Sequence, residues 1–191
     1  MTDAGVLAVL DRADPFSAVA EESPFDAADL DELAAIPDAE QTLVELAGDA
    51  AATTARRYAA AQALLCGPFE TWRSSPAGQT QVAAALGAGL RDDRTHNRWG
   101  LPGHFTGRPG DELLSLEHGV EDALAPLLDD DRRLQIIGSE EATLADDAGF
   151  RIADLAAYLL SSYRGTDWAA PASTRKRDKD IKRLKSSLVA P

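Results

Sequence analysis

An apolar helical segment near the C-terminus most constrains what this chain can fold into. Residues 150–163 read FRIADLAAYLLSSY, in which Ile152, Leu155, Ala156 and Leu159 have the spacing of one face of an α-helix. A looser copy, RRYAAAQALL, covers residues 56–65, and Arg57 and Arg151 stand in matching positions 94 residues apart. Alanine favours helix and close helix contacts, whereas strands prefer β-branched and aromatic residues. The pattern therefore predicts an all-α fold.

Size and composition indicate a globular domain. The 191 residues are 45% hydrophobic but only 6% aromatic, which is enough apolar material to bury a core. The single cysteine excludes an internal disulfide, as expected in a reducing compartment. The chain shows neither the pattern of a secretory signal nor an apolar run of about 20 residues. We therefore expect a soluble, cytoplasmic protein that binds no membrane.

The net charge of −13 is spread unevenly. Residues 1–50 carry −12, whereas residues 174–191 carry +5. Phosphate would be repelled by so acidic a half, so we expect no nucleic-acid partner. The charge fits a basic protein partner, although an acidic balance also serves solubility alone. The basic C-terminal run lacks aromatic residues and contains two aspartates, so it is read first as a solvated face.

Turn and cap residues divide the chain into segments. Asp26 is a good N-cap for a helix over 27–36, and Asp38 with Gln41 has the form of a capping box. The last helix has a narrow apolar stripe among its bases, which predicts a capping helix at the end of a helical stack. We expect one domain over 1–191, comprising an acidic segment (1–37), a first helical hairpin region (38–90), a long ordered loop (91–110) and a second helical region (111–191).

The second half, mainly residues 110–188, resembles bacterial HEAT-like (armadillo-type) repeat proteins. Its matching residues are Leu127-Leu128-Asp129-Asp130, Gly138-Ser139, Arg151-Ile152-Ala153-Asp154-Leu155-Ala156-Ala157, and Arg177 followed four residues later by Ile181. The offset of 94 residues is about two periods of such repeats. The resemblance implies irregular helical hairpins in an α–α superhelix, a binding role and no catalytic residues. No clean repeat lies midway between the two matching helices, where the long loop falls.

The loop holds the clustered polar and aromatic residues that invite a functional reading. Arg98, Trp99, His104 and Phe105 form a candidate partner-binding surface, since Trp and Arg are favoured in binding hot spots. Alternatively, Trp99 and Leu101 fill the groove between helical hairpins. His96 and His104 are candidate ligands of a small metal-dependent hydrolase, but their spacing matches no zinc pattern.

Arg151 and Asp154 lie three residues apart on an apolar helix and therefore share a face. We interpret them as a structural ion pair, and we expect Arg56 and Arg57 to hold acids of the N-terminal segment in the same way. The acidic pairs at 140–141 and 146–147 lack EF-hand spacing and are read as a loop and helix caps.

The sequence favours a non-enzymatic protein-binding module without metal or cofactor, whose acidic surface engages another, basic protein. An immunity or antitoxin-like inhibitor of a basic toxin is one concrete form, since complementary charge speeds association. The alternatives are the hydrolase using His96 and His104, and a structural subunit of a larger assembly. Oligomeric state is left open.

Overall fold

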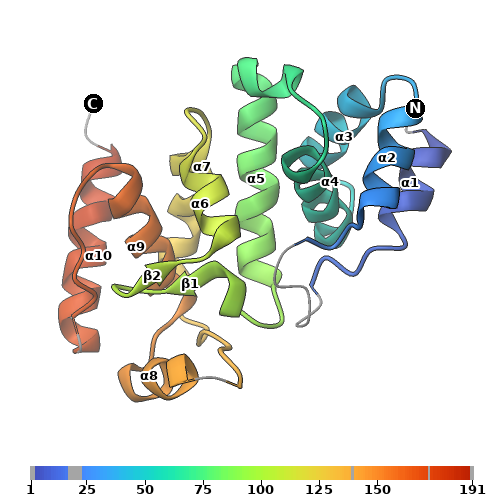
Figure 1. Ribbon diagram of the computed structural model, residues 1–191. Helices are drawn as coiled ribbons and strands as arrows, with labels where there is room; N and C mark the ends of the chain where they lie inside the picture. Colours follow the sequence, from blue (N-terminus) through green and yellow to red (C-terminus); the bar gives the residue numbers. More distant parts are fainter. Residues whose placement is uncertain (1–2, 17–22, 139, 172, 190–191) are drawn as a thin grey trace. The chain divides into compact units, whose positions relative to one another are not determined.

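The computed structural model describes residues 3–16, 23–138, 140–171 and 173–189. These residues are predominantly helical, and the only sheet among them has two short strands (Figure 1). The all-α prediction is therefore confirmed. Ser139, part of the motif on which the resemblance was based, lies outside the described residues. Within the described residues, no helix combines the length and the apolar character needed to cross a bilayer.

The chain divides into two compact units. Unit 1 comprises Met1–Asp92 together with Leu116–Gly119, and unit 2 comprises Asp93–Ser115 and Val120–Pro191. The division falls close to the start of the loop predicted over 91–110.

Unit 1 is built from helices. They are α1 (Ala4–Leu10), α2 (Ala27–Ala35), α3 (Ala39–Gly48), α4 (Thr54–Cys66), the 3₁₀ turn η1 (Thr71–Ser74) and α5 (Pro76–Asp92). α3, α4 and α5 pack on one another in pairs, and α1 and α2 pack beside α3. The first helical hairpin region predicted over 38–90 contains α3, α4, η1 and most of α5.

Small residues let α4 and α5 approach closely. Ala59, Ala60, Ala61 and Ala63 are buried on α4. On α5, a Cβ at Gly89 would lie only 2.5 Å from Cδ2 of the Tyr58 ring. The alanine- and glycine-rich composition is thus used for close contact between helices, as the sequence predicted.

Ion pairs join the N-terminal helices to the rest of unit 1. Arg12 contacts both Asp29 and Glu32, and the Arg56 guanidinium donates two hydrogen bonds of 2.8 Å to the Asp11 carboxylate. Arg57 instead donates to the backbone carbonyl of Ala47. The expectation that this arginine pair holds N-terminal acids is confirmed for Arg56.

The two predicted helix caps have different outcomes. The Asp26 carboxylate accepts a hydrogen bond of 2.9 Å from the Asp29 N–H, as predicted. The capping box at Asp38 is wrong, because Asp38 has φ 58° and its side chain makes no cap bond. Ala39 N–H donates to the Ile36 carbonyl, so Pro37 and Asp38 occupy the centre of a tight turn. The third position of a type II turn needs positive φ, which Asp tolerates.

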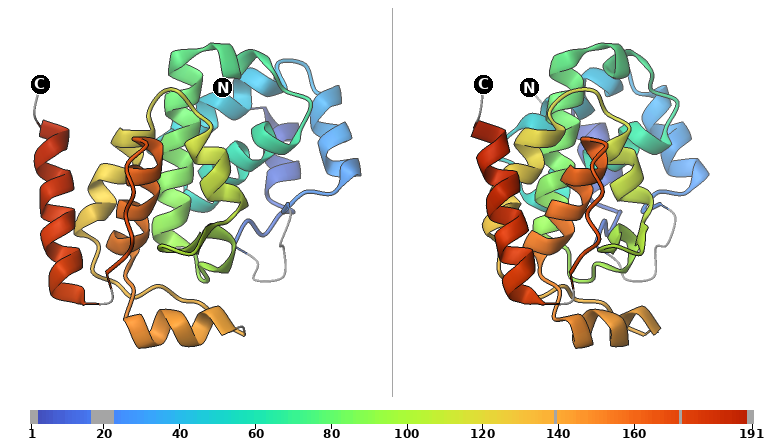
Figure 2. Two further views of the ribbon diagram at one scale, coloured as in Figure 1. Left: turned by 60° about the vertical axis from the view of Figure 1, so that its left-hand side comes forward. Right: turned by 90° about the vertical axis from the view of Figure 1, so that its left-hand side faces the viewer.

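Unit 2 mixes helices with one small hairpin. Its elements are η2 (Asn97–Trp99), β1 (Gly100–Leu101), β2 (Phe105–Thr106), α6 (Arg108–Leu114), α7 (Val120–Leu124), η3 (Ala125–Asp129), α8 (Glu140–Ala148), α9 (Ile152–Tyr163) and α10 (Thr174–Val189). α9 is its central helix, because α6, α7, η3 and α10 all pack on it. Figure 2 shows α10 alongside α9, and α8 standing apart from the other helices of unit 2.

The predicted loop contains more regular structure than expected. β1 and β2 pair antiparallel, with Gly100 opposite Thr106. Gly100 has φ 107°, a conformation open mainly to glycine. Gly107 comes so close to the Arg98 carbonyl that no Cβ would fit there. Glycine therefore serves here to fold the chain tightly.

The acidic segment 140–148, read from sequence as a loop with caps, is the helix α8 instead. Among its described residues only Ala145 is buried. With so little apolar face, its sequence carries no periodic signal. Two acids in its first turn, Glu140 and Glu141, favour a helix start because they complement the helix dipole.

The contact between Gly89 and Tyr58 yields a stability prediction. Gly89→Ala should lower the free energy of unfolding by about 1–3 kcal/mol, because the methyl group would overlap a buried ring. In a helix interior, replacing Gly by Ala normally raises stability. A decrease in stability would therefore itself indicate the close contact with Tyr58. Urea denaturation would measure it.

Gly48→Ala in α3 is the matched control. There the added methyl meets only the flexible side chain of Gln81, so stability should be unchanged or raised. Equal effects of the two substitutions would contradict the close approach of α4 and α5.

Candidate functional site

An acidic groove lies in unit 1. Its volume is about 480 Å³. It is lined by residues from the start of α3, from η1 and from the start of α5: Asp38, Glu40, Gln41, Val44, Glu45, Thr71, Trp72, Ser75 and Gly78. These residues, all within the described part of the chain, include three carboxylates and no lysine, arginine or histidine. We call these lining residues the acidic groove.

The framework of the acidic groove holds two of the carboxylates in place. Glu40 Oε1 accepts a hydrogen bond of 2.6 Å from the Trp72 backbone N–H, which connects α3 to η1. Glu45 Oε1 accepts one of 2.9 Å from the Gln41 amide one helical turn away. Asp38 is exposed at the turn before α3. The arrangement can attract and orient a cationic group.

Trp72 forms the aromatic part of this framework. Its indole N–H donates to the Phe69 carbonyl, and its ring is buried. The guanidinium of Arg73 lies over that ring, 4.6 Å from the centroid. Arg73, which follows the groove residue Trp72 in the sequence, thus makes a cation–π contact with the Trp72 ring.

The predicted partner-binding residues of the loop differ in how deeply they are buried. Trp99 is fully buried, and its indole N–H donates to the carboxylate of Asp93 at 3.0 Å. Arg98 Nε contacts the same carboxylate oxygen at 3.0 Å, with most of its side chain buried. Trp99 is therefore a core residue rather than part of an exposed surface. Asp93, which the sequence reading did not single out, organises both side chains.

The other two loop residues lie at the surface. His104 is exposed, and Phe105 is 41% exposed on β2. The four predicted residues thus do not form one exposed surface. Of the four, only His104 and Phe105 are exposed for contact with a partner.

The two histidines proposed for a hydrolase differ in environment. His96 is buried, and its Nδ1 accepts a hydrogen bond from the Gln135 N–H at 3.1 Å. Its backbone N–H donates to the Gln135 carbonyl at 2.7 Å. This histidine joins two segments of unit 2. Across the described residues, no cluster of three or more His, Cys, Asp or Glu side chains is arranged to hold a metal ion.

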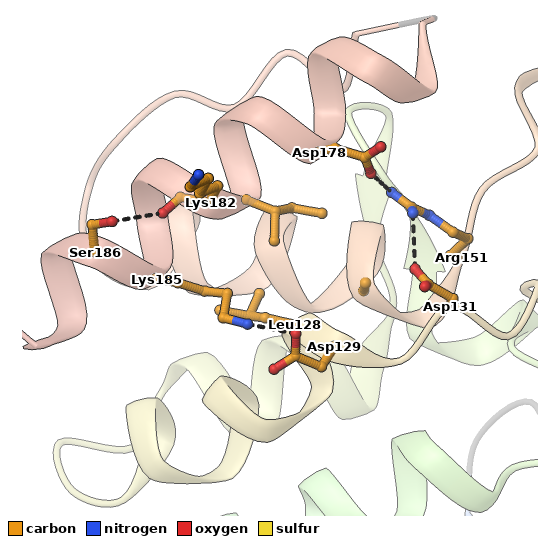
Figure 3. Close-up of a pocket in the computed structure, with 10 residues that line it drawn as sticks. Leu128, Asp129, Asp131, Arg151, Asp178, Lys182, Lys185 and Ser186 are labelled. Carbon is orange, nitrogen blue, oxygen red and sulfur yellow. Dashed lines mark hydrogen bonds and ion pairs between the residues drawn. The ribbon is translucent and has the colours of Figure 1, made fainter.

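The ion pair predicted between Arg151 and Asp154 is present. Arg151 Nη2 lies 3.0 Å from Asp154 Oδ1, and the Arg151 backbone N–H donates to Oδ2 at 2.9 Å. The Arg151 guanidinium also contacts Asp131 and Asp178 (Figure 3). The carboxylate of Asp154, and then that of Asp178, raise the pKa of the Arg151 guanidinium, while burial opposes the rise. Arg151 therefore links α9 to α10 as a permanent cation.

Arg177 completes the cluster from α10. Its side chain is fully buried, with Nε 3.1 Å from Asp154 Oδ1. Its other nitrogens donate to the backbone carbonyls of Pro171, Ala148 and Gly149. The guanidinium also lies 5.1 Å from the centroid of the Phe150 ring. One side chain thus connects α10, the chain leading into it, and the turn between α8 and α9.

A signal for Arg177 was available in the sequence. It continues the helical spacing of Ile181, Leu184 and Leu188, so it lies on the face that docks. An arginine on such a face must be paired when it is buried. No comparable signal marks Glu40 or Trp72, whose contact joins residues 32 positions apart.

Comparison of the chain with models of protein families, with curated proteins and with solved structures found no match.

Loss of the Arg177 charge should destabilise unit 2 strongly. Arg177→Met keeps the length of the side chain but removes a partner of the buried Asp154 carboxylate and the donor to three carbonyls. We expect a loss of about 3–5 kcal/mol, as for breaking a buried ion pair. Thermal and urea unfolding would measure it. Arg175→Met, on the exposed side of α10, should change stability little; a similar loss there would contradict this role.

The pair between Arg164 and Glu121 should make stability depend on pH. The Arg164 guanidinium, 2.7 Å away, lowers the pKa of Glu121 below its ordinary value of 4.5. A lowered carboxylate pKa stabilises the fold above that value, and the contribution is lost as pH falls through the folded pKa. Because the Glu121 side chain is 41% exposed, the contribution at pH 7 should be about 0.2–1 kcal/mol.

Glu121→Gln should therefore be less stable than the original chain at neutral pH, with the difference shrinking below pH 4.5. Urea denaturation at several pH values would check this. In an Arg164→Gln background the difference should be small at every pH, and a difference independent of pH in the original chain would refute the assignment.

Proposed function

We propose that this chain is a non-enzymatic protein-binding module that engages a basic protein through the acidic groove of unit 1. The observation that carries the proposal is the composition of that groove. Its volume is about 480 Å³, and its lining contains three carboxylates and no basic side chain. A lysine or arginine side chain of the partner would meet oriented carboxylates there. Such complementarity favours association rate and selects against acidic partners.

The surroundings of the groove support the same partner. Residues 1–50 carry a charge of −12, and the acids of α2 and α3 are mostly exposed. Arg12, the one base in residues 1–50, is paired with Asp29 and Glu32, and Arg56 on α4 is paired with Asp11. The field around unit 1 is therefore negative, and it steers a basic protein towards the groove.

The proposal includes a scaffold of the HEAT-like type and, in its most specific form, an inhibitor similar to immunity proteins or antitoxins. The support for the scaffold is the packing of α3, α4 and α5 on one another in unit 1, and of α7 and α10 on α9 in unit 2. The support for the inhibitor is charge complementarity with a basic toxin. The partner's identity is to be found by experiment.

Co-purification from the native host tests the proposal directly. At low salt we expect the untagged chain to elute with a basic protein in fixed stoichiometry, and the complex to dissociate at high salt because screening weakens exposed charge contacts. A complex that persists at high salt, or an acidic partner, would contradict it.

Neutral substitutions in the groove should weaken that complex. Asp38→Asn with Glu45→Gln removes two charges without changing side-chain size, and we expect affinity at low salt to fall about tenfold. Isothermal titration calorimetry would measure the change.

Asp146→Asn with Asp147→Asn on α8 is the matched control, since it changes net charge equally at two exposed positions. Equal losses in the two double variants would show that net charge alone, rather than the groove, determines binding.

A further inference from the structure

The two ends of α10 are held to unit 2 by different forces. Near its start, Arg177 is fully buried in the cluster described above, and Ile181 is 6% exposed. Breaking this end would strand a buried charge, which is costly in a low-dielectric interior. The start of α10 is therefore fixed.

The second half of the helix, residues 182–188, is held mainly by contacts that water reaches. Lys185 pairs with Asp129 of η3, with 40% and 73% of their side chains exposed. Ser187 accepts a hydrogen bond of 2.8 Å from Arg164. Leu184 and Leu188 are only half-buried. Contacts of this kind contribute little each and weaken in salt.

An open groove runs along α10 past residues 178–186, and so includes part of this weakly held half. Its volume is about 760 Å³, and its apolar floor consists of Leu128, Ala153 and Ile181. Charged groups of both signs surround it, from the end of η3, the segment between η3 and α8, the N-cap of α9, and α10: Asp129, Asp131, Arg151, Asp178, Lys182 and Lys185 (Figure 3). The groove is open to solvent, so the side chains on its two sides do not pack against each other there.

We propose that α10 is an electrostatic latch, in which residues 182–188 separate from η3 as ionic strength rises while the end at Arg177 stays docked. Opening uncovers the apolar side chains of Leu128 and Ala153. The Debye length falls from about 10 Å at 0.1 M salt to about 3 Å at 1 M, which screens the Lys185–Asp129 pair but not the buried Arg177. The freed half is too short to remain a stable helix in water. This property is independent of the acidic groove.

Hydrogen exchange of the full chain, followed by mass spectrometry, tests the latch without any substitution. Between about 20 mM and about 1 M NaCl, amides of residues 182–188 should exchange faster, while those of α9 and of residues 174–178 should not change. Unchanged exchange over 182–188 would overturn the proposal. So would faster exchange over the whole of α10, because the helix would then leave as one piece.

A variant locates the effect at the charge pair. At low salt, Lys185→Ala should speed exchange over 182–188 about two- to fivefold, the range that an exposed pair can supply. Lys179→Ala makes the same change on the same helix at an exposed position that forms no ion pair within the described part of the chain. It should leave exchange unaltered, and equal behaviour of the two variants would overturn the assignment.

Discussion

A charge removed from water is the interaction on which unit 2 depends most. The Arg177 guanidinium is fully buried, so its charge requires partners inside the unit. Its Nε forms an ion pair with the Asp154 carboxylate, and its two terminal nitrogens donate to backbone carbonyls at the α8–α9 turn and just before α10. Those carbonyls must therefore point inward at defined positions. The start of α9, the turn before it and the entry into α10 are thus constrained together.

Unit 1 uses a different principle. Its core combines large apolar side chains, such as those of Leu43, Leu64 and Leu86, with alanine and glycine, which let α4 and α5 approach until a glycine faces the Tyr58 ring. This close packing leaves little room for charged side chains inside unit 1. The acids of the N-terminal third therefore lie at its surface. Where α3 meets η1, several of them surround one groove. Three of the acids are thereby brought together at one place, which is the basis of the binding role proposed above.

Local signals predicted a good part of this fold. The 3.6-residue apolar pattern of α9 and the Asp26 cap need only neighbouring residues, and both are present as expected. Other predictions failed where distant or competing contacts decide. Asp38 is a residue type that often caps helices, but the turn that it forms with Pro37 holds its backbone at positive φ. α8 lacks an apolar stripe, so nothing in its pattern distinguishes it from an acidic loop.

The candidate functional residues show the same division. The sequence by itself determined the helical class, the excess of acid at one end, and the pairing of Arg151 with Asp154, because three-residue spacing on a helix makes neighbours of them. Only the tertiary structure decided that Trp99 is buried against Asp93, and that Glu40 reaches the backbone of Trp72. Each of these contacts depends on how the chain folds back between the two residues. Burial is a property of all the neighbours in space, and the residues next to a side chain in sequence do not specify it.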